Sequence, residues 1–240
     1  MSQFVCNEKL LDFLLYSYFE CDREENEIEV IQKCARRAYR DLARTVRYAH
    51  PASEPEKAKA DSGLAAFKNL QKKHISDVCN DMAQSIYACK EGFNKFDSWH
   101  KKKCKWIIHK MNKPYDDRKK FLKEDFTYGQ AQKWLNMTLK YLWLLDRLPE
   151  GIKAQSLHVP IDRFILEKLK ETGKFNEKSS KITGSGESFF YNGKTWSAMS
   201  DIKNYKNLQE EIKEIAGEAN LLPIEWESLA WLEIAKRKRK

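Results

Sequence analysis

The chain has 240 residues, and its 44 lysines and arginines outnumber its 35 aspartates and glutamates to give a net charge of +9. This length can bury a core without disulfide or metal staples, and no apolar run approaches the ~20 residues of a membrane-spanning helix. The N-terminal sequence MSQFVCNEKLLDFLL lacks the basic leader and small-residue cleavage site of a secretory signal, so we expect a cytoplasmic protein outside membranes.

Helical periodicity dominates the N-terminal half. Apolar residues recur at helical spacing over residues 4–19 and 25–48, and His50-Pro51 ends the second of these helices. A capping-box pattern at residues 53–56 predicts a helix to about residue 72, and further helices are expected over residues 74–90, before Gly92, and 93–112, before Pro114. No alternating strand pattern occurs in this half.

The C-terminal half is predicted to be helical as well. Thr127-Tyr128-Gly129-Gln130 fits a capping box. The helix that it starts carries Trp134 and Tyr141 on an apolar face and Lys133, Asn136 and Lys140 on the other. After a loop at residues 148–151, Pro160 marks the next helix start, with Ile161, Phe164, Ile165 and Leu169 on its buried face. A small hairpin is expected around residues 192–194, followed by helices over about residues 200–219 and 223–237.

The predicted fold class is therefore all-α, with at most one small hairpin. No repeat or low-complexity linker divides the chain, so residues 1–240 are expected to form a single helical domain. A soft boundary between two lobes is placed near residues 113–123, and the functional core is placed at residues 127–170.

The positive charge is unevenly distributed. Basic residues crowd one stretch, at Lys101, Lys102, Lys103, Lys105, Lys110, Lys113, Arg118, Lys119, Lys120 and Lys123, and the chain ends in a basic block at residues 236–240. Such a distribution favours a polyanionic partner, with nucleic acid as the leading candidate. The alternative is a charge that serves only solubility.

Metal and nucleotide motifs are absent. The six cysteines, Cys6, Cys21, Cys34, Cys79, Cys89 and Cys104, form no C-x-x-C pair, so we expect reduced thiols, mostly packed in helices. The five histidines show no metal-ligand spacing, and no P-loop, Rossmann glycine pattern or nucleophile elbow occurs. The sequence thus predicts no cofactor and no metal, and directs attention to lysine and carboxylate chemistry.

Two predicted helix starts bring such chemistry together. Lys133 and Asp162 are 29 residues apart, which allows one helix, a loop and an antiparallel return. An amine nucleophile must be neutral to attack, a state that neighbouring cations and partial desolvation favour. A carboxylate stays ionised most easily at a helix N-terminus. A lysine beside an anionic aspartate suits attack on a sugar C1′ that develops positive charge. The simpler interpretation is a solvated lysine and a helix-capping aspartate.

The two segments resemble the catalytic core of the 8-oxoguanine DNA glycosylase fold in the helix-hairpin-helix DNA glycosylase superfamily, and are most similar to its compact archaeal members. That family combines a Gly-x-x-x-Lys helix start with a Pro-Ile/Val-Asp helix start about thirty residues later. Gly129-x-x-x-Lys133 and Pro160-Ile161-Asp162 match these two parts. The likeness covers roughly 40 residues, and the superfamily's hairpin glycines and four-cysteine loop are absent.

The resemblance implies a two-lobed helical fold and a DNA glycosylase that flips its target base into a pocket. Lys133 would be the nucleophilic or Schiff-base lysine and Asp162 its carboxylate partner, with AP-lyase activity when a Schiff base forms. Candidates for the base pocket are the tryptophans Trp134, Trp106, Trp99 and Trp196. Candidates for contacts with the DNA backbone are Lys101, Lys102, Lys103, Lys105, Lys119, Lys120 and Arg163.

The target base and the biological role stay open at this point. An oxidised purine fits the family and a role in DNA repair, whereas a hypermodified phage base would fit a role in antiviral defence. Two other interpretations also remain: a non-catalytic helical protein that binds nucleic acid, and a helical interaction domain of a defence or toxin–antitoxin system. The oligomeric state is not predicted.

Overall fold

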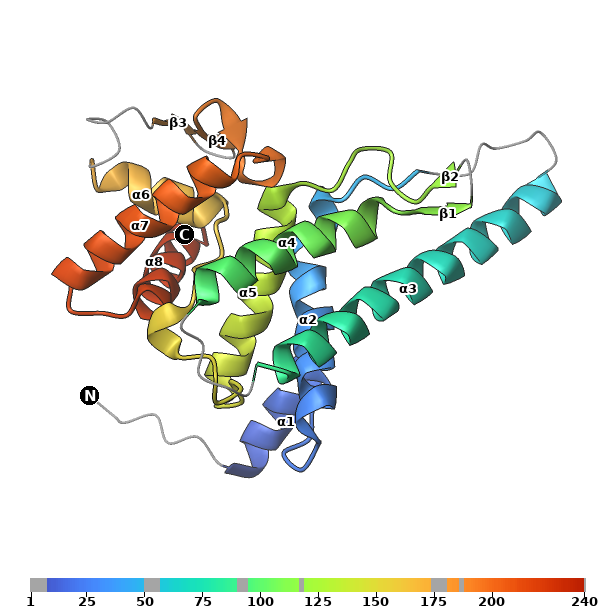
Figure 1. The fold of residues 1–240 in the computed structure, drawn as a ribbon, viewed down its shortest axis with the longest axis horizontal. Helices are drawn as coiled ribbons and strands as arrows, with labels where there is room; N and C mark the ends of the chain where they lie inside the picture. Colours follow the sequence, from blue (N-terminus) through green and yellow to red (C-terminus); the bar gives the residue numbers. More distant parts are fainter. Residues whose placement is uncertain are drawn as a thin grey trace.

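The computed structural model describes residues 8–49, 57–89, 95–116, 119–173, 181–185 and 188–239. Helices make up most of this part of the chain, as the sequence predicted (Figure 1). The helices are α1 (Glu8–Phe19), α2 (Glu27–Leu42), α3 (Lys57–Tyr87), α4 (Phe96–Asn112), α5 (Tyr128–Leu144), α6 (Arg163–Glu171), α7 (Ile202–Glu218) and α8 (Pro223–Arg237), and the short 3-10 turns are η1 (Ala43–Thr45), η2 (Ala154–Ser156) and η4 (Trp196–Ala198). The strands are β1 (Pro114–Asp116), β2 (Lys119–Lys120), β3 (Ile182–Ser185), β4 (Ser188–Tyr191) and β5 (Lys194–Thr195).

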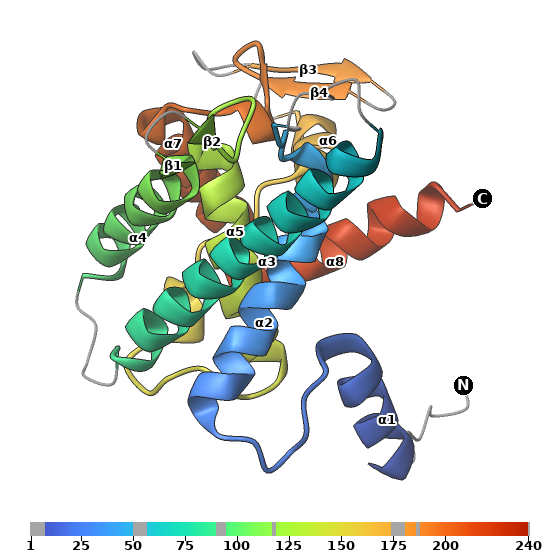
Figure 2. The same ribbon diagram turned by 90° about the vertical axis from the view of Figure 1, so that its right-hand side faces the viewer.

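Helix α5 lies at the centre of the molecule. α2 and α4 pack along it, and α3 crosses α2 (Figure 1). On another side, α6 packs against α8, and the sheet of β3 and β4 covers α6 (Figure 2). One hydrophobic core runs through all of these contacts and links both halves of the sequence. α5 is therefore the element on which the other parts meet.

Helix α3 differs from the prediction, which placed one helix after the capping box at residues 53–56, to about residue 72, and a second helix at residues 74–90. The structure has a single helix of 31 residues. The residues at the expected break, Lys72, Lys73 and His74, include no glycine or proline, so nothing in the backbone stops the helix there. The capping-box pattern at residues 53–56 and the break at Gly92 lie outside the described residues.

The strand content also exceeds the expectation of at most one hairpin. The predicted hairpin exists: Tyr191 pairs with Lys194 across Asn192-Gly193, and both turn residues have positive φ, as a type I′ turn requires. β3 adds a third antiparallel strand to it, and β1 and β2 form a second small sheet. These additional strands are two to four residues long, which is too short for an alternating pattern to reveal.

The boundaries of the remaining helices follow local signals. Asn26 caps α2 by accepting a hydrogen bond from the amide of Glu29, and Pro223 opens α8 at its first position, where a proline is tolerated. The region proposed as a lobe boundary, residues 113–123, contains β1 and β2. None of the described helices is long and apolar enough to cross a bilayer.

Candidate active site

The first turn of α5 is fixed by the capping box that the sequence predicted. The side chain of Thr127 accepts from the amide of Gln130 at 3.1 Å, and the side chain of Gln130 accepts from the amide of Thr127 at 3.0 Å. Gln130 also donates to the carbonyl of Thr45 at 2.8 Å, which ties this turn to the end of α2 and η1. Two free backbone donors are satisfied in this way, so the helix has a defined start at Tyr128, five residues before Lys133.

The face of α5 that carries Lys133 is buried, which agrees with the desolvation that a reactive lysine needs and not with the simpler interpretation of a solvated lysine. Lys133 is only 6% exposed and Asn136 is fully buried. The segment before α6, together with η4, covers this face, so α5 is buried nearly all round. Polar residues at helical spacing can mark a buried hydrogen-bonded interface as well as a solvent face, and the sequence pattern does not separate the two.

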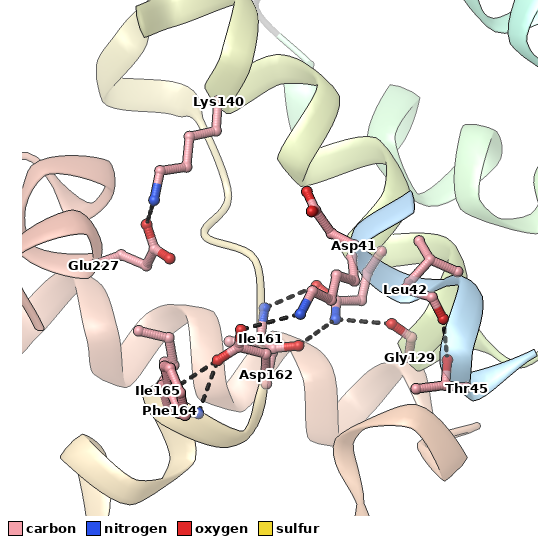
Figure 3. Close-up of polar contacts among 12 residues, drawn as sticks. Asp41, Leu42, Thr45, Gly129, Lys140, Ile161, Asp162, Phe164, Ile165 and Glu227 are labelled. Carbon is pink, nitrogen blue, oxygen red and sulfur yellow. Dashed lines mark hydrogen bonds and ion pairs between the residues drawn. The ribbon is translucent and has the colours of Figure 1, made fainter. Parts of the chain in front are cut away.

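Lys133 and Asp162 meet, as the spacing of the two helix starts predicted. Nζ of Lys133 donates to Oδ2 of Asp162 at 3.0 Å. The other oxygen, Oδ1, accepts from the amides of Phe164 and Ile165 at 2.9 and 3.1 Å, so Asp162 is the N-cap of α6 (Figure 3). α6 itself begins at Arg163, three residues later than Pro160, where a helix start was predicted.

The electrostatic environment keeps Asp162 ionised. Burial alone would raise its pKa, but the ammonium of Lys133 and the two backbone amides at the start of α6 outweigh burial and lower the pKa below the ordinary 3.8. The side chains of Lys133 and Asp162 are 8% and 14% exposed. The site therefore holds an ion pair that is almost closed off from solvent.

Trp196 closes this space on one side. Nζ of Lys133 lies 4.6 Å from the centroid of its ring, in a cation–π arrangement. Trp196 begins η4, which docks on the first turn of α5 through two hydrogen bonds, from the amide of Gly129 to the carbonyl of Met199 and from the hydroxyl of Thr127 to the carbonyl of Ser197. Of the four tryptophans proposed for a base pocket, the structure places Trp196 beside Lys133.

No family model, curated protein or solved structure matches this chain. What the site can do chemically follows from its own residues. It combines an amine, a carboxylate that remains ionised and an aromatic ring within a few ångström of one another. This set can supply a nucleophile, stabilise a developing cation and stack on a planar group.

Gly129 has a steric role that explains the Gly-x-x-x-Lys pattern here. A Cβ on Gly129 would lie 1.8 Å from the carbonyl oxygen of Trp196, a backbone atom that cannot turn aside. The absence of a side chain at Gly129 thus lets η4 approach α5, and this approach sets the Trp196 ring over Lys133.

We expect Gly129→Ala to lower the free energy of unfolding by about 1–3 kcal/mol, because overpacking forces the backbone to shift. Urea denaturation measures the change, and near-ultraviolet circular dichroism reports a displaced tryptophan. Gly217→Ala in α7 is the matched control, since no heavy atom other than those of its chain neighbours and its own helix backbone lies within 4 Å of a Cβ there. A Gly129→Ala variant as stable as wild type would show that η4 does not depend on this contact.

Sequence reasoning missed the residues that place Asp162. Gln132 grips the preceding residue Ile161 at both backbone groups: its Oε1 accepts from the amide at 3.2 Å, and its Nε2 donates to the carbonyl at 3.0 Å. Gln209 of α7 binds both backbone groups of Val159 in the same manner, each at 2.9 Å. The two side-chain amides thus satisfy the backbone groups of Val159 and Ile161, as a paired β-strand would. Their burial was the missing signal, and it is not visible in a sequence pattern.

A buried polar network extends from this segment to the surface. Nδ2 of Asn136 donates to Oε1 of Gln132 at 3.1 Å and to the hydroxyl of Tyr205 at 3.0 Å. That hydroxyl lies 2.9 Å from Nδ1 of His158, whose Nε2 lies 3.0 Å from Oδ1 of the exposed Asp97. Burial lowers the pKa of His158 despite the nearby carboxylate, which favours a neutral ring. These contacts make the histidine a satisfied core residue rather than a metal ligand.

The other three tryptophans proposed for the base pocket contact residues other than Lys133. The prediction for Trp134 is wrong, because this residue belongs to the core. Trp134 is fully buried, and its Nε1 donates to the carbonyl of Ala35 in α2 at 2.8 Å. It follows Lys133 directly, so the helix turns it by about 100° away from the lysine. Trp99 and Trp106 are half-buried on α4, where Trp99 contacts Phe96 and Trp106 lies between two lysines.

The proposed DNA-backbone residues fall into two groups. Lys101, Lys102 and Lys105 are exposed on α4, as a backbone contact requires. The others differ: Lys103 is half-buried against Trp106, Lys120 is exposed but pairs with Asp125 at 3.3 Å, Arg163 lies over the ring of Phe164 at 5.1 Å, and the side chain of Lys119 lies outside the described residues. The first group is therefore the clearest basic surface among these candidates.

The described cysteines are free thiols, as predicted. Cys21, Cys34, Cys79, Cys89 and Cys104 are all buried, and Cys6 lies outside the described residues. Burial raises the pKa of Cys21 and Cys89 to about 11 and of Cys79 to about 12, so these thiols are poor nucleophiles at neutral pH. No group of three potential metal ligands occurs within the described ranges.

Proposed function

We propose that this chain is a DNA glycosylase that releases a modified base, with Lys133 as the nucleophile and Asp162 as its carboxylate partner. The observation that carries the proposal is the 3.0 Å contact between Nζ of Lys133 and Oδ2 of Asp162 at two helix starts, beneath the ring of Trp196. The positive charge of the chain and the exposed lysines of α4 support DNA as the partner. We also propose that the helices form the two-lobed fold of the helix-hairpin-helix DNA glycosylases.

In the proposed reaction, a flipped nucleotide displaces the ring of Trp196 from Lys133, and its base stacks against that ring. Lys133 loses one proton to the solvent, and its neutral Nζ bonds to C1′ while the bond from C1′ to the base nitrogen breaks. The electron pair leaves with the base, which takes up a proton. Asp162 stabilises the positive charge that the sugar develops as the bond breaks, because its carboxylate is held ionised at the helix start.

The covalent product determines whether strand cleavage follows. Opening of the sugar ring converts the lysine adduct into a Schiff base between Nζ and C1′. Loss of a 2′ proton then expels the 3′-phosphate by β-elimination, and water releases Lys133. If water attacks C1′ in place of Lys133, the enzyme releases the base without cleaving the strand. The base itself is an oxidised purine, with a role in DNA repair, or a hypermodified phage base, with a role in antiviral defence.

The decisive experiment is borohydride trapping with the wild-type protein. Duplexes carrying an abasic site, 8-oxoguanine or glucosylated hydroxymethylcytosine are incubated with the protein and borohydride, and base release is followed in parallel. We expect a covalent adduct at Lys133 with at least one duplex. Base release without an adduct would remove the lyase step and leave a monofunctional glycosylase. No adduct and no release from any duplex would favour a non-catalytic DNA-binding protein.

The salt dependence of DNA binding tests the exposed lysines of α4. We expect replacement of Lys101, Lys102 and Lys105 by glutamine to reduce the slope of log K against log salt by about one per lysine, because each lysine that contacts a phosphate releases counterions. Fluorescence anisotropy with a labelled duplex at several salt concentrations measures this slope. Replacement of Lys203, Lys206 and Lys213, which are exposed on α7, removes the same charge and should leave the slope close to that of wild type.

A further inference from the structure

Helix α1 exposes an apolar face at one end of the molecule. Leu10, Phe13, Leu14 and Tyr16 are exposed by 58%, 67%, 53% and 59%. A single exposed leucine is ordinary on a protein surface, but large apolar side chains gathered on one helix form a contiguous patch, and such patches mark interaction sites. The sheet of β3 and β4, which covers α6, lies at the opposite end of the molecule (Figures 1 and 2). The patch is therefore separate from the candidate active site.

The other side of α1 fixes the helix to the body of the protein. Phe19 packs against the hydrophobic core, and its ring centroid lies 5.1 Å from that of Tyr141, near the end of α5. The hydroxyl of Tyr18 accepts a hydrogen bond from the guanidinium of Arg37 in α2 at 2.6 Å. The helix cannot rotate to bury its outer face without breaking these contacts.

The outer face has the spacing of a helix that packs against another helix. Leu10, Phe13, Leu14 and Ser17 follow one another at i, i+3, i+4 and i+7, and we call these four residues the α1 seam. At about 100° per residue, the centre of the α1 seam lies on the side of the helix opposite to Phe19. The hydroxyl of Ser17 donates to the carbonyl of Leu14 at 3.2 Å, so burial of this serine leaves no unpaired donor. The α1 seam is thus suited to burial.

The charge of α1 disfavours a polyanionic partner. The helix contains two acidic residues, Glu8 and Asp12, and one basic residue, Lys9. The carboxylate of Asp12 pairs with Arg23. A helix that lies on an anionic membrane has a polar face rich in lysine and arginine, and a contact with DNA needs the same charge. An apolar protein surface therefore fits the α1 seam better than a lipid headgroup or a nucleic acid.

We propose that the α1 seam is a dimer interface, in which it packs against the same seam of a second copy about a two-fold axis. A two-fold axis brings one surface against itself, so the surface must be self-complementary, and an apolar seam without charges meets this condition. The inference does not depend on the proposed activity, because Lys133 lies near the start of α5 and α1 contacts Tyr141 near its end.

The exposed area is sufficient for a specific but reversible dimer. Six side chains of about 200 Å² each, exposed by 41–67%, offer roughly 650 Å² per copy. These are Leu10, Leu11, Phe13, Leu14, Tyr16 and Tyr18. Specific interfaces bury about 600–1,000 Å² per partner, so the area lies at the lower end of this range. We expect a dimer that dissociates at micromolar concentrations rather than an obligate one.

The mass of the full-length protein in solution tests the interface. Sedimentation velocity at increasing concentration, up to about 100 µM, should show wild-type protein approaching twice the 28.3 kDa of one chain. Leu10→Glu or Phe13→Glu brings two negative charges together in an apolar seam, and each should weaken dimerisation at least about 30-fold. Leu229→Glu is the matched control, because Leu229 of α8 is 57% exposed, and this variant should dimerise like wild type.

A mixture of two variants tests the two-fold symmetry. Phe13 lies in the middle of the α1 seam, where each residue is nearest to its own copy, so Phe13→Lys should be as monomeric as Phe13→Glu. An equimolar mixture of these two should associate at least about tenfold more tightly than either variant alone, because unlike charges then meet. A mixture no more dimeric than its components would overturn the packing of the seam on itself.

Three further outcomes would contradict the proposal. Wild-type protein that stays monomeric at the highest concentration would show that a second copy does not cover the α1 seam. Monomeric protein that binds vesicles of phosphatidylcholine and phosphatidylglycerol would assign the seam to a lipid surface. A dimer that persists in both glutamate variants, or that is lost in Leu229→Glu alone, would place the interface elsewhere. Circular dichroism should show that all variants fold, since the substituted side chains are exposed.

Discussion

We expect Lys133→Gln to abolish borohydride trapping and to lower base release by at least about 10³-fold, since the amide has no nucleophilic amine to bond to C1′. Quenched time courses on the duplex that the wild-type protein cleaves measure the loss. The expected effect is large because the proposed mechanism has no second amine in contact with Asp162 among the described residues.

Lys133→Arg is the control that separates chemistry from folding. A guanidinium keeps the positive charge and can bind Asp162, but it does not form a Schiff base. We therefore expect this variant to fold with a circular dichroism spectrum like that of wild type and to trap no DNA. An adduct that persists in either variant would place the nucleophile at another lysine and would contradict the proposed site.

The start of the candidate site could be predicted from the sequence because its signals are local. Thr127 and Gln130 form a capping box within four residues, and Asp162 caps a helix through amides two and three residues later. Such contacts depend only on neighbouring residues, so the sequence contains them completely. The meeting of Lys133 and Asp162 followed from one helix and one loop between them, which leaves few ways for the chain to return.

The remainder of the site could not be predicted because it depends on segments far apart in the chain. Trp196 reaches Lys133 because Gly129 lets η4 approach, and Glu227 reaches Lys140 from a helix 87 residues further on. Trp134 shows the same limit in the opposite direction, since its partner Ala35 precedes it by 99 residues. Local periodicity assigns these residues to helix faces, but the identity of what covers each face is a tertiary property.

Asp162 joins two roles, and its substitution by asparagine should separate them. An asparagine keeps an oxygen that can cap α6, and asparagine and aspartate are nearly equal as N-caps. It loses the charge that stabilises a cationic sugar and that pairs with Lys133. We expect Asp162→Asn to lower base release by about 10²–10³-fold, the range found when one group that stabilises a charged transition state is removed.

The difference in the free energy of unfolding between the wild-type protein and Asp162→Asn should decrease as the pH falls. Because the folded protein holds the pKa of Asp162 below its ordinary 3.8, the carboxylate stabilises the fold at neutral pH, and this contribution is lost as the pH falls through the lowered pKa. The wild-type protein should thus be more stable than Asp162→Asn at neutral pH, and the difference should shrink in strong acid. Urea denaturation at several pH values measures both free energies.

Asp201→Asn provides the matched control for these measurements. Asp201 caps α7 by accepting from the amide of Lys203 at 2.8 Å. This variant should lose less than about 0.5 kcal/mol, because a capping oxygen remains, and should release base at the wild-type rate. If Asp162→Asn also released base at the wild-type rate, Asp162 would be only a helix cap, and the charge pair with Lys133 would have no part in the reaction.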